Sequence, residues 1–125
     1  MGESNNARSE ARSAVLGRMK KPATVIVEVR GQKIEVREPT AEQYESAMID
    51  AGCRGNTNGD LALGEMERLA RMLGFECSYI PGTGERLFEE ADREAYAEMT
   101  RNDEARVLGE RAFRMAISAS VAGKN

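Results

Sequence analysis

A stretch of alternating residues between Thr24 and Arg37 constrains the fold more than any other feature of this chain. Apolar residues occupy every second position on both sides of a central glycine, Gly31. Such period-two alternation is typical of β-strands with one buried face, so the segment predicts a β-hairpin. The apolar positions are Val25, Val27, Val29, Ile34 and Val36.

The turn of this hairpin determines which residues face each other. If Gly31–Gln32 form a two-residue turn with glycine first, as a type II′ turn prefers, the apolar positions of the two strands pair. Because a lone hairpin is marginally stable in water, the valine face must lie on helices or on another subunit. The facing pairs predicted by this register are Val29 with Ile34, Val27 with Val36 and, less favourably, Glu28 with Glu35.

The first helix after the hairpin has clear start and stop signals. Thr40 and Gln43 have the spacing of a capping box, and Gly52 ends the pattern. The apolar face predicted for this helix consists of Tyr44, Ala47, Met48 and Ala51. A polar connector, 53–59, follows, and its glycines match no phosphate-binding pattern.

Three further helices are predicted downstream. A helix capped by Asp60 is expected to end at Gly74, and its face is formed by Ala62, Met66, Leu69, Ala70 and Leu73. Segment 75–80 is either a short strand or an extended connector, followed by a turn at 81–84 and an apolar anchor pair, Leu87–Phe88. An acidic helix is predicted over 89–99, with Ala91, Ala95 and Met99 in line on one face. Its acidic side chains are expected to form a face exposed to solvent. The last helix is capped by Asn102 or Asp103, and its stripe comprises Ala105, Leu108, Ala112, Phe113, Met115, Ile117, Ala119 and Val121.

The sequence therefore predicts a mostly helical α+β fold, in which the N-terminal hairpin packs on about four helices. Residues 23–125 form one domain, and residues 1–22 form a flexible basic arm. The arm is either a plain disordered tail or a segment that becomes helical against a partner. Through Lys21 the chain carries five cations and two acids, a net charge of +3, whereas the remainder carries 13 cations and 19 acids, a net charge of −6.

The composition argues against catalysis. The chain has no His, no Trp and only two Cys, so the common proton shuttles and metal ligands are scarce. Cys53 and Cys77 lack a CxxC spacing, and two reduced thiols are favoured over a disulfide. No apolar run approaches the length of about 18 residues that a membrane span needs. We expect no enzyme activity, no metal, no cofactor and no membrane, and the acidic body argues against nucleic-acid binding.

Methionine is the more informative residue type. Seven Met accompany only three Phe and three Tyr, and flexible Met side chains can repack against varied partners. The alternative is that these residues are ordinary core. The partner-binding candidates are Val25, Val27, Val29, Tyr44, Met48, Met66, Leu69, Leu108 and Met115.

The order of these features resembles the small tail assembly chaperones of long-tailed bacteriophages. The resemblance covers about Thr24 to Ser120 and rests on VIVEVRGQKIEVREPTAEQ, on a helix ending in RMLG, and on YIPGTGERLF before an acidic helix. It implies a non-enzymatic protein of the host cell cytoplasm that binds and solubilises the tape measure protein and helps recruit tail tube protein. It also suits a homo-oligomer. The alternatives are a structural tail or head–tail connector component of the virion, and a small regulatory binding protein.

Overall fold

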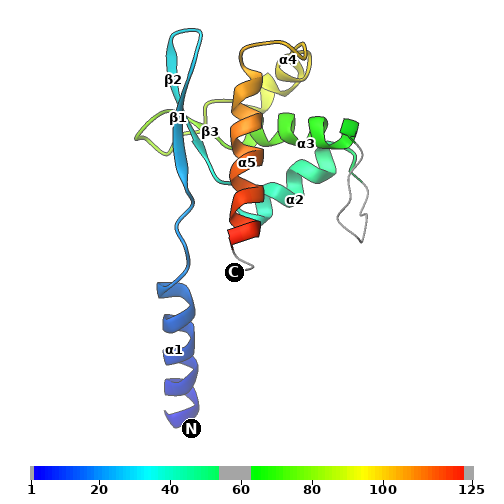
Figure 1. The fold of residues 1–125 in the computed structure, drawn as a ribbon. Helices are drawn as coiled ribbons and strands as arrows, with labels where there is room; N and C mark the ends of the chain where they lie inside the picture. Colours follow the sequence, from blue (N-terminus) through cyan, green and yellow to red (C-terminus); the bar gives the residue numbers. More distant parts are fainter. Residues whose placement is uncertain (1, 54–62, 123–125) are drawn as a thin grey trace.

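The computed structural model describes residues 2–53 and 63–122, with side chains over 5–53 and 63–118. An isolated N-terminal helix points away from a body in which a small antiparallel sheet packs on helices (Figure 1). This confirms the mostly helical α+β fold and the packing of the hairpin on helices. In chain order the elements are α1 Gly2–Gly17, β1 Thr24–Val29, β2 Gln32–Arg37, α2 Ala41–Asp50, α3 Leu63–Glu76, β3 Ser78–Tyr79, the 3-10 turn η1 Glu90–Asp92, α4 Arg93–Ala97 and α5 Arg106–Ala122.

The hairpin turn lies one residue earlier than predicted. Val29 pairs with Gln32, so Arg30 and Gly31 are the central residues of the turn. Their φ angles are 50° and 79°, which is the pattern of a type I′ turn, in which both central residues are left-handed. The predicted Gly31–Gln32 turn is therefore wrong, and Arg30 adopts the conformation that glycine or asparagine would adopt more easily.

The corrected register keeps the valine face but changes the charges on the other face. Each residue of β1 faces a β2 residue two positions earlier than predicted, so Val27 faces Ile34 and not Val36. A shift of two residues leaves each side chain on the same face of the sheet. Glu28 faces Lys33, and not Glu35 as predicted. Opposite charges directly across a strand pair stabilise it, whereas like charges destabilise it, so this register is the more favourable one.

Helix α2 begins as predicted. The Thr40 hydroxyl accepts a hydrogen bond from the Gln43 backbone N–H at 3.1 Å, and the Gln43 side chain accepts one from the Thr40 N–H at 3.0 Å. The capping box is thus confirmed, and Gly52, with φ 73°, follows the helix end. The predicted connector after Cys53, its glycines, Asp60 and Ala62 lie outside the described residues.

Helices α3 and α5 cross through two facing glycines. Gly74 was predicted to end α3, but the helix continues to Glu76 and Gly74 is buried inside it. A Cβ at Gly74 would lie 2.7 Å from the backbone nitrogen of Gly109, and a Cβ at Gly109 would overlap the carbonyl oxygen of Ala70. Gly74 is therefore a close-packing residue and not a helix stop.

The predicted segment 75–80 is divided between the end of α3 and a short strand. Phe75 and Glu76 complete the helix, and Ser78–Tyr79 form β3, which pairs antiparallel with β2. The predicted turn at 81–84 is present, since the Thr83 N–H donates to the Ile80 carbonyl at 3.2 Å. The sheet order is β1-β2-β3.

The acidic segment is more broken than predicted. In place of one helix over 89–99, the chain forms η1 and the five-residue helix α4. Ala91 and Ala95 are exposed, and Tyr96 is the buried residue of α4. The predicted line of Ala91, Ala95 and Met99 is therefore not the buried face.

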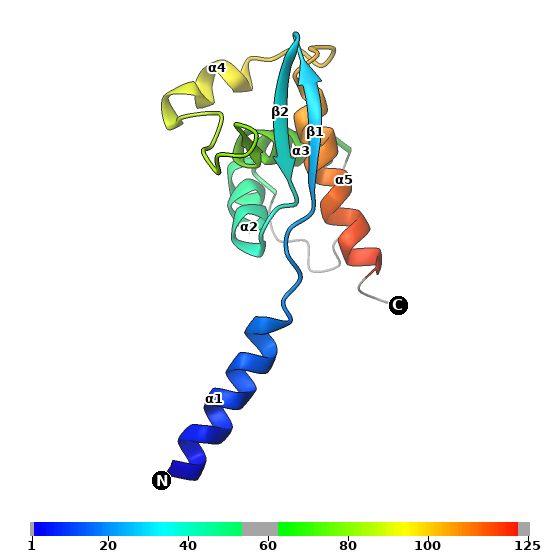
Figure 2. The same cartoon turned by 90° about the vertical axis from the view of Figure 1, so that its left-hand side faces the viewer.

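Helix α5 starts after Asp103, whose carboxylate accepts a hydrogen bond from the Ala105 N–H at 2.9 Å. Of the predicted stripe, Leu108 and Ala112 are fully buried, whereas Ile117 is 46% exposed. Ala119 and Val121 lie beyond the described side chains. In the turned view the hairpin lies in front of α5 and α3, with α4 to one side (Figure 2).

The predicted arm contains a helix. In α1 every described side chain is exposed, including Val15 and Leu16. The arm joins the body through Lys20, whose ammonium lies 3.2 Å from Glu38, and through the Ala23 N–H, which donates to the same carboxylate at 3.0 Å. No helix within 2–53 and 63–122 combines the length and apolar character required to cross a membrane.

Candidate binding site: an apolar groove beside the hairpin

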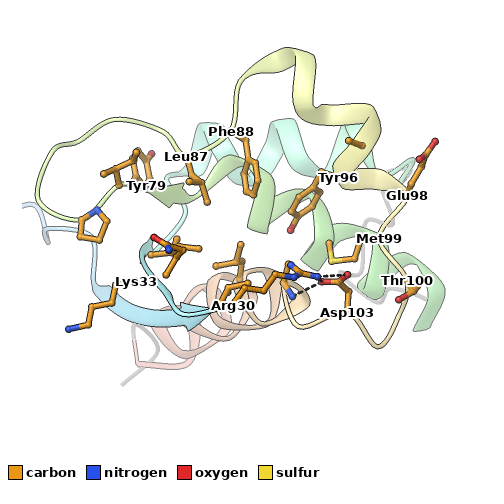
Figure 3. A pocket seen from close by; sticks show the side chains of 18 residues that line it. Arg30, Lys33, Tyr79, Leu87, Phe88, Tyr96, Glu98, Met99, Thr100 and Asp103 are labelled. Atoms are coloured by element: carbon orange, nitrogen blue, oxygen red, sulfur yellow. Dashed lines mark hydrogen bonds and ion pairs between the residues drawn. The ribbon is translucent and has the colours of Figure 1, made fainter.

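An open groove of about 630 Å³ lies beside the turn end of the hairpin. The hairpin forms one wall, the loop after β3 a second, and α4 with the segment that follows it a third (Figure 3). Its apolar lining comes from the hairpin, the segment between β3 and η1, the segment after α4, and α5: Val29, Ile34, Ile80, Pro81, Leu87, Phe88, Met99 and Leu108.

An aromatic cluster builds one side of the groove. Phe88 stacks on Phe75 with ring centroids 5.5 Å apart, and Tyr96 meets Phe88 edge to face at 5.0 Å. Such offset and T-shaped pairs are the favourable aromatic geometries. The predicted anchor pair Leu87–Phe88 does pack on the core, and it also forms part of the groove wall.

The hydroxyl of Tyr96 has no hydrogen-bond partner within the described residues. It is buried at the α3–α5 crossing, where it would overlap a Cβ placed on Gly74. Burial raises the pKa of Tyr96, so the phenol stays neutral. Because this hydroxyl lies against Gly74, it provides no polar anchor for a ligand in the groove.

The rim of the groove is polar. The Arg30 guanidinium donates to both carboxylate oxygens of Asp103, at 2.9 and 3.0 Å, and so joins the hairpin turn to the start of α5. Hydrogen bonds from the Ala105 N–H, and then from Arg30, hold the pKa of Asp103 below 3.8. A lowered pKa in the folded state means that this ion pair stabilises the fold above about pH 4. That contribution is lost as the pH falls through the lowered value.

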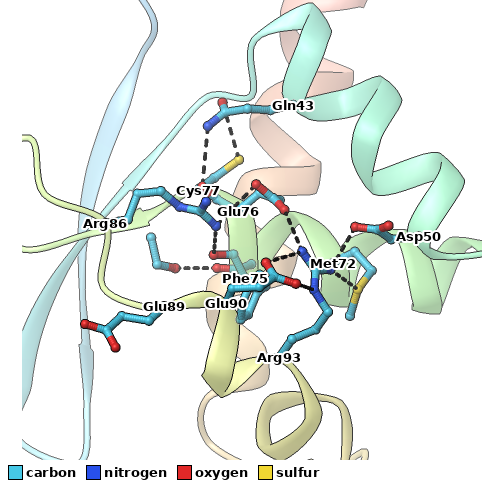
Figure 4. A network of polar contacts seen from close by, with 12 residues as sticks. Gln43, Asp50, Met72, Phe75, Glu76, Cys77, Arg86, Glu89, Glu90 and Arg93 are labelled. Atoms are coloured by element: carbon cyan, nitrogen blue, oxygen red, sulfur yellow. Dashed lines mark hydrogen bonds and ion pairs between the residues drawn. The ribbon is translucent and has the colours of Figure 1, made fainter.

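A network around Arg93 supports the aromatic cluster from outside the groove (Figure 4). The Arg93 guanidinium lies 2.8 Å from Asp50 of α2 and 3.5 Å from Glu76 of α3, and it also bonds Glu90 at 2.6 Å. Its central carbon stands 4.8 Å from the Phe75 ring centroid. One side chain therefore connects α2, α3 and the α4 segment through charge and through cation–π contact.

Comparison with known proteins gives no identity for this arrangement. No protein-family profile, curated protein or solved structure matches the chain.

The reactive side chains of the described region are inert or engaged. Cys53 and Cys77 are both free and buried. Burial raises the pKa of the Cys77 thiol to about 12 and also raises the pKa of Cys53, so neither is a thiolate nucleophile at neutral pH. Across the described ranges, no group of three or more His, Cys, Asp or Glu side chains is arranged to hold a metal ion.

Four of the predicted partner-binding residues are core residues. Leu69 and Leu108 are 0% and 1% exposed, and Val27 and Val29 are 7% exposed each. Their side chains pack in the core of this chain, and two of them, Val29 and Leu108, also line the groove. The prediction is corrected for Val27 and Leu69, whose side chains belong to the interior of the domain and do not line the groove.

The other five are partly buried and scattered. Val25, Tyr44, Met48 and Met115 pack against the edge of the core, and Met66 is half-buried near the start of α3. Of the nine candidates, only Val29 and Leu108 line the groove. The sequence pattern gave no indication that these two residues lie close together.

The groove residues that the sequence analysis missed are chiefly Tyr96, Ile80 and Pro81. Tyr96 was overlooked because the alanine spacing of its helix suggested another face. Ile80 ends the segment 75–80 that we expected to be a short strand or a connector, and Pro81 begins the predicted turn at 81–84. A signal was available, since large apolar residues beside a turn have no helix face to occupy and must cover a neighbouring element.

Proposed function

We propose that this protein is a non-enzymatic assembly chaperone whose groove holds an apolar helical segment of a client protein. By its resemblance to tail assembly chaperones, the client is the tape measure protein of a long-tailed bacteriophage. The protein would act in the host cytoplasm, keep this client soluble and help recruit tail tube subunits. The observation that carries the proposal is the open apolar groove beside the hairpin.

The shape and lining of the groove favour side chains of a protein over a small molecule. Its volume of about 630 Å³ admits a few large apolar side chains. Small-molecule sites usually fix their ligand by a few convergent polar groups, but here Arg30 and Asp103 bond each other and the Tyr96 hydroxyl is directed at Gly74. A helix laid in a groove instead binds through apolar anchors spaced three or four residues apart.

The flexible side chain of Met99 suits this role. It is half-buried in the groove wall, and the exposed Ile80 lines the same groove. Met side chains repack around different apolar shapes, which lets one groove accept many sequences. The mixed charges of the rim, with Lys33 and Glu98, would keep a complex with an apolar client soluble.

The proposal is tested by co-expression with fragments of the tape measure protein encoded by the same genome. We expect the wild-type protein to keep such fragments soluble and to co-purify with them. Ile80→Glu places a charge in the groove wall and should abolish both effects. Ile49→Glu is the matched control, because Ile49 is 71% exposed on α2 and outside the groove, and it should behave as wild type.

Two results would contradict the proposal. One is fragments that stay insoluble beside the wild-type protein. The other is equal solubilisation by wild type, Ile80→Glu and Ile49→Glu, once circular dichroism has shown that all three are folded.

A structural role in the tail or in a head–tail connector is a second candidate. It is favoured by β1, an edge strand that could extend the sheet of a neighbouring subunit. Mass spectrometry of purified particles distinguishes the two functions, since a connector is present in finished virions and a chaperone is absent from them.

A further inference from the structure

The outer edge of β1 carries unused backbone hydrogen-bonding groups. In the β1–β2 ladder, the Glu38 N–H donates to the Ala23 carbonyl at 2.7 Å, which fixes the odd-numbered residues of β1 as those that bond β2. The N–H and C=O groups of Thr24, Ile26 and Glu28 therefore point away from β2. No partner for these groups occurs within the part of the chain that the structure describes.

This edge is the open one of the sheet. Strand β2 is paired on both sides, and the far side of β3 is bridged by Arg86, which pairs with Tyr79. Edge strands invite the addition of another strand unless charge, proline or a bulge protects them. At the centre of β1 the side chain facing solvent is Ile26, which is 51% exposed.

A second groove, of about 470 Å³, runs between the start of β1 and α5. Thr24 and Val25 line it from the strand, and Arg111, Arg114 and Met115 line it from α5. Figure 2 shows α5 descending behind the hairpin toward the start of β1, and α5 contacts both β1 and β2. Neither arginine has an ion pair or hydrogen bond among the described residues, in contrast to Arg93 and the other paired arginines of the body.

We propose that the edge of β1 binds an extended acidic segment of another protein, which adds a strand to the sheet and places acidic side chains on Arg111 and Arg114. The added strand would bond the backbone of Thr24, Ile26 and Glu28. Because side chains alternate along a strand, the residue opposite Val25 points toward α5, where the two arginines lie. This gives the two elements of strand addition, a backbone edge for affinity and a side-chain pocket for specificity.

The charges favour an acidic segment over a second copy of this chain as the strand that pairs with β1. A second β1 would direct its own valine face toward α5, so it would bring no acid to Arg111 or Arg114. The inference does not rest on the chaperone function, because the edge of β1 and the groove beside the hairpin turn share no lining residue.

The test uses the full-length protein and a short synthetic peptide in which Val and Glu alternate. Like charges on every second residue keep such a peptide extended and soluble at neutral pH. Fluorescence anisotropy measures binding, and amide hydrogen exchange by NMR locates it. We expect saturable binding, with the amides of Thr24, Ile26 and Glu28 becoming protected, and no binding of a peptide in which Lys replaces Glu.

Two variant pairs test the two halves of the site. The double variant Arg111→Glu, Arg114→Glu should raise the Kd for the acidic peptide at least about tenfold. Arg8→Glu with Arg12→Glu on α1 changes the net charge equally, outside the groove, and should leave the Kd close to wild type. Ile26→Pro removes an outward N–H that β2 does not use and should weaken binding, whereas Ile26→Ala keeps that N–H and should weaken it less.

Any of three results overturns the proposal. The first is no saturable binding of the acidic peptide. The second is binding without protection of the Thr24, Ile26 and Glu28 amides. The third is an equal loss of affinity in the Arg111/Arg114 and Arg8/Arg12 double variants, which would indicate general charge attraction. If Ile26→Pro fails to fold, the arginine variants and the exchange data decide the question.

Discussion

Two helical regions of this protein are held in opposite ways. Helix α1 has every described side chain in solvent and is joined to the body through Lys20 and Glu38. Helices α3 and α5 meet so closely that Gly74 and Gly109 leave no room for a Cβ. The same backbone conformation is thus maintained by local interactions in one region and by tertiary packing in the other.

This difference predicts that α1 and the body of the protein unfold separately. An isolated helix of about 16 residues is marginal in water, whereas a helix packed in a core takes its stability from its neighbours. The body should therefore unfold as one unit set by the α3–α5 crossing, and α1 should open and close independently of it. Substitutions in the body and in α1 can test this division.

The largest effect is expected at the helix crossing. Gly109→Ala places a methyl group against the Ala70 carbonyl, and backbone cannot yield as a flexible side chain can. We expect a loss of about 3 kcal/mol or more in the free energy of unfolding, measured by urea denaturation. Gly64→Ala is the matched control, because its Cβ would meet only the Arg68 guanidinium at 3.6 Å, and it should be neutral or stabilising by up to about 1 kcal/mol. Equal effects of the two changes would refute the close crossing.

The next effect is expected at Arg93. Arg93→Met keeps much of the apolar stem but removes the bonds to Asp50, Glu76 and Glu90, and the contact with Phe75. We expect a loss of about 2 kcal/mol, and Arg93→Lys should recover less than half of it because an ammonium cannot replace the fork of donors.

The control for Arg93 is an exposed ion pair. Arg101 lies 2.6 Å from Glu67, yet its side chain is 79% exposed. Arg101→Met should change the free energy of unfolding by less than about 0.5 kcal/mol. If both methionine variants cost the same, the Arg93 network is no more than surface charge.

Smaller effects on stability, of opposite sign, are expected for substitutions of two tyrosines. Tyr96→Phe removes a buried hydroxyl that has no partner in the described region, so stability should stay equal or rise by up to about 1 kcal/mol. Tyr79→Phe removes a hydroxyl that accepts a hydrogen bond from the Gln43 side chain at 3.0 Å and should cost about 1 kcal/mol. Thermal unfolding of the two variants side by side checks the sign. A destabilised Tyr96→Phe would reveal a partner for that hydroxyl.

The sequence was sufficient where the signal is local. The capping box of Thr40 and Gln43 and the valine face of the hairpin are written in adjacent residues and could be predicted. The turn register was also within reach, because the pairing of Glu28 with Lys33 is favourable and the pairing with Glu35 is not. The valine pattern alone could not decide, since both registers keep the same faces.

Features that depend on contacts between residues far apart in the sequence could not be predicted. Gly74 reads locally as a helix stop, and its role depends on Gly109, which lies in another helix. The groove was missed for the same reason, because its walls come from the hairpin, the turn after β3 and the α4 segment. The partner-binding candidates were chosen as apolar stripes, and the stripes with the most regular spacing, such as the one containing Leu69, proved to be core.

The smallest effect is expected from removing α1. A variant that begins at Met19 lacks the helix but keeps Lys20 and Ala23, the two residues that contact Glu38. Since no described side chain of α1 is buried, we expect the free energy of unfolding of the body to change by less than about 0.5 kcal/mol. Hydrogen exchange on the full chain should show fast exchange across α1 and slow exchange across α3 and α5. A clear loss of stability in the shortened chain, or slow exchange in α1, would mean that this helix packs on the body or on a second copy in solution.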